Sequence, residues 1–322
     1  MNKLSEEFLN NLNIEAKNYY NQSTNDAIQR SDIWISNFQG LYSIMNLDIN
    51  PVEKINEILK HQFYSSGITY KEITEKEIQW NIDYLKENYN INIDDLLNSN
   101  IAESEFYNKK KSFTYNNELL SSDFFRHLFA ILEIQKHCQL TNNTQYNVIE
   151  LGSGVGALGR IFKLYNKKIK YFFIDIPESL YFSFLHIRLN FPNNSYKYVI
   201  SNDKIDINNE NIDFYFIPVK YIECLYDNKF DLFINECSLG EMNQSTVDYW
   251  FDFLQNKINL KYFYSFNRYF DDARSNSYTA YDNKWKILCD NINPKFNEVP
   301  DHPYGKYLSI THNFEKITER II

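Results

Sequence analysis

The sequence predicts an α/β protein in which a doubly wound sheet follows an α-helical N-terminal region. Three observations carry this prediction. From residue 147 onward, short apolar runs alternate with amphipathic stretches, which is the pattern of successive strands and helices. A glycine-rich turn follows the first apolar run, and an acidic residue ends the second. Residues 1–120 contain only two glycines, Gly40 and Gly67, and their patterns are helical.

Helical signals come first along the chain. Residues 51–59 read as a helix because Pro51 stands in the first turn, where proline is tolerated, and residues 71–87 continue the helical pattern. Ser121, Ser122 and Asp123 then offer N-caps for a further helix whose apolar residues recur at helical spacing. We expect this helix to pack against the sheet.

The most informative feature is the glycine-rich turn that follows the predicted strand 147–151. Half of the eight glycines fall within eight residues, at Gly152, Gly154, Gly156 and Gly159. Glycine adopts positive φ angles and lets a ligand approach the backbone where a Cβ atom would collide. The turn therefore predicts a loop that binds a nucleotide-type cofactor.

An acidic residue at the right distance supports this interpretation. A helix is predicted over 157–165 and a second strand over 170–175, which ends in Asp175. An acid about 20 residues beyond the glycine turn is placed to accept hydrogen bonds from ribose hydroxyls. Strand, turn, helix, strand and acid together form one βαβ unit.

Two cofactor classes use such a unit. The segment Gly154–Gly159 satisfies the G-x-G-x-x-G pattern of dinucleotide enzymes, so a nicotinamide-dependent oxidoreductase stays an alternative. Glu150, however, ends the first strand in an E-x-G-x-G-x-G pattern and would repel a pyrophosphate. S-adenosylmethionine has no phosphate and carries an ammonium group that a carboxylate can bind. A tight turn without any ligand is the third interpretation.

The remaining elements continue the alternation of strands and helices. Helices are expected near 178–189 and over 246–254. An antiparallel edge hairpin is expected near the end of the chain, between 295–299 and 306–312. The other predicted strands cover 196–200, 213–217, 230–235 and 261–266.

Composition excludes several classes of protein. The net charge of −9 and the pI near 5.3 argue against a nucleic-acid partner, and only Lys109–Lys111 forms a basic run. No stretch approaches the ~18 uninterrupted apolar residues of a membrane span, and the N-terminus has early acids without an apolar signal segment. The four cysteines contain no C-x-x-C pair and fit a reducing compartment. We therefore expect a soluble cytoplasmic protein.

Three segments together resemble the sugar O-methyltransferase family of class I S-adenosylmethionine-dependent methyltransferases. They are 150–156, 174–178 and 230–242, and the similarity runs from about residue 121 to the end. The resemblance implies a Rossmann-like, seven-stranded methyltransferase domain over 121–322, with 1–120 as a helical accessory or lid region. It also implies methyl transfer to a hydroxyl of a sugar or nucleotide-linked glycan precursor. Ser153 departs from the family, which often has a glycine there.

Ligands of open α/β sheets lie beyond the carboxyl ends of the strands, so the predicted site residues follow from the strand ends. Glu150 and Asp175 are expected at the ammonium and ribose groups of the cofactor. The other predicted cofactor-binding residues are Gly152, Ser153, Gly154, Gly156 and Ile176 around the turn, Ile217 and Pro218 as a wall for adenine, and Glu236, Cys237 and Ser238 near the methionine portion.

Methyl transfer mainly requires alignment of a hydroxyl and removal of its proton. Glu241 and His302 are the candidate bases, with a helix N-terminal charge and an exposed loop histidine as their respective alternatives. Arg126 and Arg268 could hold an anionic group of the acceptor, or could form surface pairs. No oxygen cluster indicates Mg²⁺, and no metal is predicted. A homodimer is left open, as is a non-catalytic subunit that binds the cofactor to support a partner.

Overall fold

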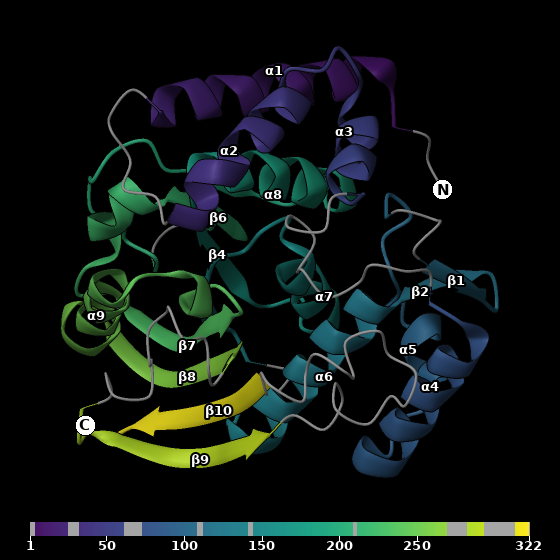
Figure 1. The fold of residues 1–322 in the computed structure, drawn as a ribbon, viewed down its shortest axis with the longest axis vertical. Coiled ribbons are helices and arrows are strands. Elements are labelled where there is room, and N and C mark those ends of the chain that lie inside the picture. The colour runs from purple at the N-terminus through teal and green to yellow at the C-terminus, as the bar shows by residue number, and fades with distance from the viewer. Residues whose placement is uncertain are drawn as a thin grey trace.

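The computed structural model describes residues 4–24, 32–60, 73–107, 112–140, 144–208, 211–268, 282–292 and 313–321. Within these ranges a central sheet is covered by helices on both faces (Figure 1). This is the Rossmann-like α/β fold that the sequence predicts. A separate hairpin of β1 (Ser112–Tyr115) and β2 (Glu118–Ser121) lies just before the first sheet-covering helix.

The sheet contains one strand more than the seven that the resemblance implies, counting the described residues. Only β10 runs antiparallel to its neighbours β8 and β9, and all other adjacent strands are parallel. The short strand β5 extends the sheet beyond β6. In spatial order the strands are β5 (Tyr196–Tyr198), β6 (Phe214–Pro218), β4 (Lys170–Asp175), β3 (Asn147–Leu151), β7 (Lys229–Glu236), β8 (Asn259–Arg268), β10 (Asn313–Arg320) and β9 (Trp285–Ile292).

The C-terminal hairpin was predicted over two segments that lie outside the described residues, 295–299 and 306–312. The antiparallel pair in the described residues is β9 with β10. Both strands carry charged side chains, and those of Glu315 and Lys316 in β10 are buried. In β10, Glu315 accepts a hydrogen bond from Tyr264 at 2.8 Å, and Lys316 lies 3.7 Å from Asp290. These partners allow charged residues to lie in a buried strand.

Two helical layers cover the sheet because the strand residues alternate between its faces. Val148, Tyr171 and Ile234 belong to one buried cluster, whereas Ile149 and Phe172 belong to the other. Helices α6 (Ser122–His137), α7 (Ala157–Tyr165) and α8 (Pro177–Asn190) pack on the first cluster. The second face is covered by η2 (Val219–Leu225), α9 (Gln244–Asp252) and η4 (Phe253–Lys257).

The N-terminal helices form a further layer. Helix α1 (Glu6–Ser23), α2 (Asp32–Met45) and α3 (Pro51–Ile58) contact α8, at the top of Figure 1. Helix α4 (Glu75–Tyr89) contacts α6 and α5 (Ile93–Asn98). Their buried residues join the cluster on the α8 face, and the division of the chain at residue 121 stays a prediction. None of the described helices combines the length and apolar composition needed to cross a membrane.

Polar contacts hold this layer in place. Lys54 of α3 donates hydrogen bonds to the carbonyl of Met45 at 2.6 Å and to the hydroxyl of Tyr181 in α8 at 3.3 Å. Arg160 of α7 donates to Glu103 at 3.0 Å, and both side chains are buried. A buried charged group needs hydrogen-bond or ionic partners, so these contacts help to fix where the N-terminal layer lies.

Gly159 tests the packing between α7 and the sheet. A Cβ atom at Gly159 would lie 2.4 Å from Cε1 of Phe173, so we expect Gly159→Ala to lower the free energy of unfolding by about 1–3 kcal/mol. Alanine is the better helix former, and the exposed helical Gly40 is the matched control: Gly40→Ala should raise stability by up to about 1 kcal/mol. Urea unfolding measures both, and equal shifts of the same sign would contradict the packing argument.

Candidate functional site

The carboxyl ends of four parallel strands meet at one edge of the sheet. Leu151 of β3 pairs with Ile174 of β4 and with Asn235 of β7, and Asp175 pairs with Pro218 of β6. The chain continues from β3 toward β4 on one side, and later returns to β7 on the other side. Such a switch point in an open α/β sheet is where ligands bind. The strand order therefore places the candidate site beyond β3 and β7.

The glycine turn has the backbone conformation that its sequence predicts. Gly152, Gly154 and Gly156 have φ angles of 77°, 55° and 75°. A Cβ atom at Gly152 would lie only 2.3 Å from Oγ of Ser238, so no larger residue fits there. Ser238 in turn donates a hydrogen bond to the carbonyl of Leu151 at 3.1 Å. The end of β7 thus lies directly against the turn after β3.

Asp175 accepts hydrogen bonds from two backbone N–H groups, one in the glycine turn and one at Ile176, the N-cap of α8. The N–H groups of Gly154 and Ile176 donate to its two carboxylate oxygens at 2.9 and 2.8 Å. Burial raises the pKa of Asp175 to about 7, and these bonds, together with Ser179, limit the rise. The side chain stays partly exposed. A partly exposed carboxyl group that the backbone holds in place is suited to accept hydrogen bonds from a diol.

Glu150 lies on the face of the sheet that α6 and α7 cover. Only 4% of it is exposed, and it accepts a hydrogen bond from the hydroxyl of Tyr171 at 2.9 Å. Burial raises its pKa well above the usual range, and nearby Glu236 raises it further. The Tyr171 bond and Arg126 lower it, but they do not compensate. A carboxylate in this position would be stabilised by an additional cation.

Glu236 ends β7 and faces the first turns of α6. Its Oε2 atom lies 3.2 Å from Nδ1 of His127 and 3.7 Å from Nη2 of Arg126. Burial alone would raise the pKa of Glu236, but Arg126 and His127 reverse the effect and lower it. Asp123 lies 3.9 Å from the same guanidinium and also accepts a hydrogen bond from Tyr107 at 2.6 Å.

These side chains form a buried polar cluster, Asp123, Arg126, His127, Glu150 and Glu236, which we call the α6–β7 cluster. It contains three carboxyl groups, one guanidinium and the imidazole of His127, which faces Glu236, and each residue is at most partly exposed. Arg126 contacts Glu236 and Asp123, so its charge is shared between them. The cluster is therefore short of positive charge near Glu150, and it would attract a cationic group and repel an anionic one.

The segment after β7 is fixed by two asparagines. Asn235 donates to the carbonyl of Leu151 at 3.0 Å and accepts from the N–H of Leu239 at 3.1 Å. Asn267 of β8 donates to Asn235 at 2.9 Å and accepts from the N–H of Gly240 at 3.2 Å. Cys237 has a φ angle of 64°, which turns the chain sharply out of β7. This network determines the course of residues 236–241.

The other predicted residues divide into three groups. Ser153, Ile176, Ile217 and Pro218 lie at the ends of β3, β4 and β6 and are buried. Glu241 lies in η3 (Leu239–Glu241) and is partly exposed, and the N-cap of α9 is Asn243, which accepts from the N–H of Thr246 at 2.9 Å. Arg268 ends β8, but its side chain, like His302, lies outside the described residues.

Sequence patterns missed His127, Tyr171 and Asn267. His127 and Tyr171 looked like packing residues because they occur within apolar patterns. Their polar atoms are used only because α6 and β4 bring them to Glu236 and Glu150. One sequence signal was available: an acid at the end of an apolar strand needs a buried partner, and α6 supplies Arg126 and His127 next to each other.

No protein-family model and no curated protein matches the chain. Among solved structures, it is similar to a SAM-dependent methyltransferase from Aquifex aeolicus, with 12% identity, 60% of this chain and 89% of that chain covered, and a TM-score of 0.37. It is also similar to a methyltransferase from Pyrococcus furiosus, with 9% identity, 77% of this chain and 98% of that chain covered, and a TM-score of 0.38. A third similar structure is M. capricolum TrmK in complex with S-adenosyl-homocysteine, with 12% identity, 58% of this chain and 67% of that chain covered, and a TM-score of 0.35. Because these sequence identities and TM-scores are low, the similarities do not assign a function, and the residues of the site have to carry it.

Glu150→Gln tests the electrostatics of the α6–β7 cluster. The raised pKa means that the folded state keeps the proton of Glu150 to higher pH than the unfolded state, which ionises near pH 4.3. The contribution of Glu150 to the free energy of unfolding is thus fully present below about pH 4.3. It is lost as the pH rises from there through the pKa of the folded state, by up to about 1.4 kcal/mol per pH unit. Glutamine stays neutral and can accept the Tyr171 hydrogen bond.

We therefore expect Glu150→Gln to be more stable than the native protein at pH 8, and close to it at pH 4.5, without ligand. Urea unfolding at both pH values measures the difference. Asp175 titrates with the same sign in both proteins, so its contribution cancels. A variant that is less stable than the native protein at pH 8 would show that Glu150 is ionised and well paired.

Proposed function

We propose that this protein is an S-adenosylmethionine-dependent O-methyltransferase that acts on a hydroxyl of a sugar or nucleotide-linked glycan precursor. The observation that carries the proposal is the arrangement of two acids around one glycine turn. Asp175 is bonded to the backbone of the turn, and Glu150 lies in a buried cluster that is short of positive charge. A ligand with a diol at one end and a cation at the other fits both acids.

The residues present suit this cofactor. The positive φ angles of Gly152, Gly154 and Gly156 open the turn to a ligand, and Asp175 would accept hydrogen bonds from the ribose. Ile217 and Pro218 are buried at the carboxyl end of β6, where we propose that they form the apolar wall beneath the adenine. Glu150 would attract the ammonium group, either directly or through water. When bound, S-adenosylmethionine supplies a methyl group on a sulfonium, which is already a good leaving group.

The same charges disfavour the dinucleotide alternative. A pyrophosphate at the glycine turn would approach Glu150 and Glu236, and Arg126 is already ion-paired with Glu236 at 3.7 Å. Dinucleotide sites instead present backbone N–H groups at a helix N-terminus without a competing carboxylate. The embedded G-x-G-x-x-G pattern is therefore a weaker guide than the acid that precedes it.

Glu241 is the proposed general base. It lies in η3, in the segment after β7 that Asn235 helps to hold, and its side chain is partly exposed, whereas the N-cap of α9 is Asn243. A carboxylate can take the proton of a hydroxyl as the hydroxyl attacks the methyl group. His302 is the alternative base, proposed from the sequence alone.

For the acceptor, we propose that Arg268 and Arg126 attract an anionic group, such as the phosphate of a nucleotide sugar. Arg126 is buried between Asp123 and Glu236, so it would have to exchange one partner for another. Arg268 ends β8 beside the carboxyl end of β7. We therefore expect Arg268 to make the direct contact and Arg126 to act through the charge of Glu236.

Calorimetric titration with S-adenosylhomocysteine tests the cofactor assignment. Each acid makes a charge-assisted contact worth about 1.5–3 kcal/mol, so Glu150→Gln and Asp175→Asn should each weaken binding about ten- to hundredfold. Glu223→Gln, an exposed carboxylate in η2, is the matched control and should bind normally. Unchanged affinity in both site variants, or tight binding of NADH, would exclude the assignment.

Product release separates an enzyme from a non-catalytic subunit. With nucleotide sugars or glycan extracts as acceptors, the native protein should release S-adenosylhomocysteine. Loss of a general base typically costs about 10²–10⁴ in rate, so Glu241→Gln should lower kcat by that factor and leave cofactor affinity unchanged. If His302→Ala has this effect and Glu241→Gln does not, the base is His302. If no acceptor yields product although the cofactor binds, the non-catalytic alternative applies.

A further inference from the structure

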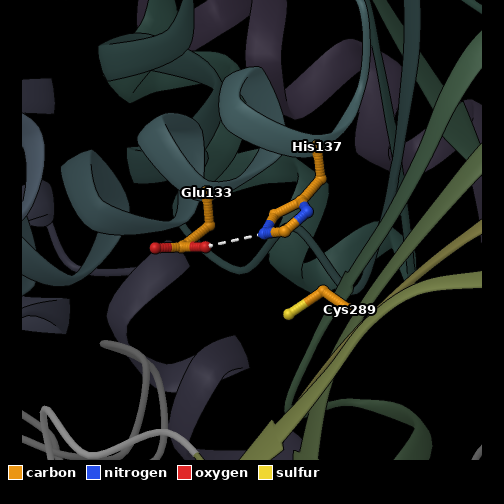
Figure 2. A group of neighbouring side chains, drawn as sticks. All are labelled: Glu133, His137 and Cys289. Atoms are coloured by element: carbon orange, nitrogen blue, oxygen red, sulfur yellow. Dashed lines mark ion pairs between the residues drawn. The ribbon is translucent and has the colours of Figure 1, made fainter.

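Three side chains with metal-binding chemistry meet near the C-terminal end of α6 (Figure 2). One donor atom each of Glu133, His137 and Cys289 lies within 4.8 Å of the other two. Nε2 of His137 is 3.4 Å from Oε2 of Glu133, and Figure 2 shows Cys289 below this pair, on the neighbouring strand. The group is separate from the α6–β7 cluster, which uses the first turns of the same helix.

The fold brings these residues together from distant positions. Glu133 and His137 are four residues apart in α6 and so share one face of the helix. Cys289 belongs to β9, where the register slips: Ile317 of β10 pairs with Cys289, but Thr318 pairs with Ile287. The extra residue in β9 forms a bulge, and a bulge changes the direction of adjacent side chains.

We propose that Glu133, His137 and Cys289 bind a zinc ion that links α6 to β9. A thiolate, an imidazole nitrogen and a carboxylate oxygen are the protein ligands that Zn²⁺ takes in tetrahedral sites. The thiolate excludes Mg²⁺ and Ca²⁺, which prefer oxygen ligands. Three protein ligands leave the fourth position to water, and His137 is partly exposed, which gives the ion a route in. The Cys289 thiol gives its proton to solvent as its sulfur binds the ion.

The surroundings support a cation at this point. Tyr89 donates a hydrogen bond to Oε1 of Glu133 at 2.5 Å, while Oε2 faces His137, an orientation typical of a metal-binding carboxylate held by an outer partner. The opposing charge is Lys136, whose Nζ atom lies 3.6 Å from Glu133.

A simpler explanation covers only part of the group. Acid and histidine at i and i+4 of a helix often form an ion pair, and this accounts for Glu133 and His137. It predicts no role for Cys289 and no dependence of the pair on Tyr89. The two explanations therefore differ in what substitution of the cysteine should do.

Metal titration of the full-length protein distinguishes them. After treatment with a chelator, the native protein should bind one zinc ion per chain in competition with a chromophoric chelator. Cobalt(II) in its place should give intense visible absorption typical of a tetrahedral site, and a near-ultraviolet band from thiolate to cobalt. Zinc should also raise the melting temperature, because it binds the folded state.

Single substitutions assign the ligands. Cys289→Ser should abolish the thiolate-to-cobalt band, and His137→Ala should abolish stoichiometric zinc binding. Cys237→Ser is the matched cysteine control and should bind zinc like the native protein. Absence of zinc binding to the native protein, or an unchanged cobalt spectrum in Cys289→Ser, would overturn the proposal.

Two substitutions outside the ligand set keep the test valid if a ligand variant does not fold. Lys136→Ala removes an exposed opposing charge and should tighten zinc binding by up to about fivefold. Tyr89→Phe removes the outer hydrogen bond and should weaken it by about tenfold or more. Circular dichroism checks that both variants are folded. No change in either affinity would contradict a site built on Glu133. This result does not depend on methyl transfer.

Discussion

Among the described side chains, the buried guanidinium of Arg126 determines the electrostatics at the carboxyl edge of the sheet. Arg126 contacts both Asp123 and Glu236, while Glu150 lies nearby without a cation of its own among the described contacts. Burial favours the neutral form of each carboxyl group. Arg126 and His127 outweigh this effect at Glu236 and lower its pKa, whereas the pKa of Glu150 is raised because its partners do not compensate for burial. The cluster thus has room for one more positive charge, and the proposed cofactor follows from this imbalance.

The contact between Gly152 and Ser238 couples the two halves of the candidate site. Any side chain at Gly152 would collide with Ser238, and Ser238 and Asn235 both hydrogen-bond to Leu151. The turn that would bind the cofactor and the segment that would carry the base are therefore held at a fixed distance. Asn267 extends this network to β8, so the site is supported by three adjacent strands.

Helix α6 connects the regions of the molecule for which we propose a role. Its first turns contribute to the α6–β7 cluster, and its last turns carry Glu133 and His137 opposite β9. Its middle is buried between the sheet and α4. A zinc ion at its C-terminal end would restrain the helix that positions Arg126 and His127. The same helix would then contribute both to the stability of the fold and to the charge distribution of the α6–β7 cluster.

Several parts of the fold could be predicted because their signals are local. The strands 147–151 and 170–175 and the helix 157–165 have the predicted bounds, and Ser121 caps α6 as expected. Hydrophobic periodicity, capping and glycine conformation depend on near neighbours in sequence. The bounds of β9 and β10 were not predicted, because the buried charged residues of β10, Glu315 and Lys316, depend on partners that lie on neighbouring strands.

The sequence by itself determined the βαβ unit, the glycine turn and the acid that ends β4, since each depends on residues close together in the chain. Only the tertiary structure decided the partners of the buried charges. Glu236 lies beside His127 and Cys289 lies beside His137, although each pair is more than one hundred residues apart in the chain. No spacing rule links such positions, because the distance between them depends on how the sheet and α6 pack.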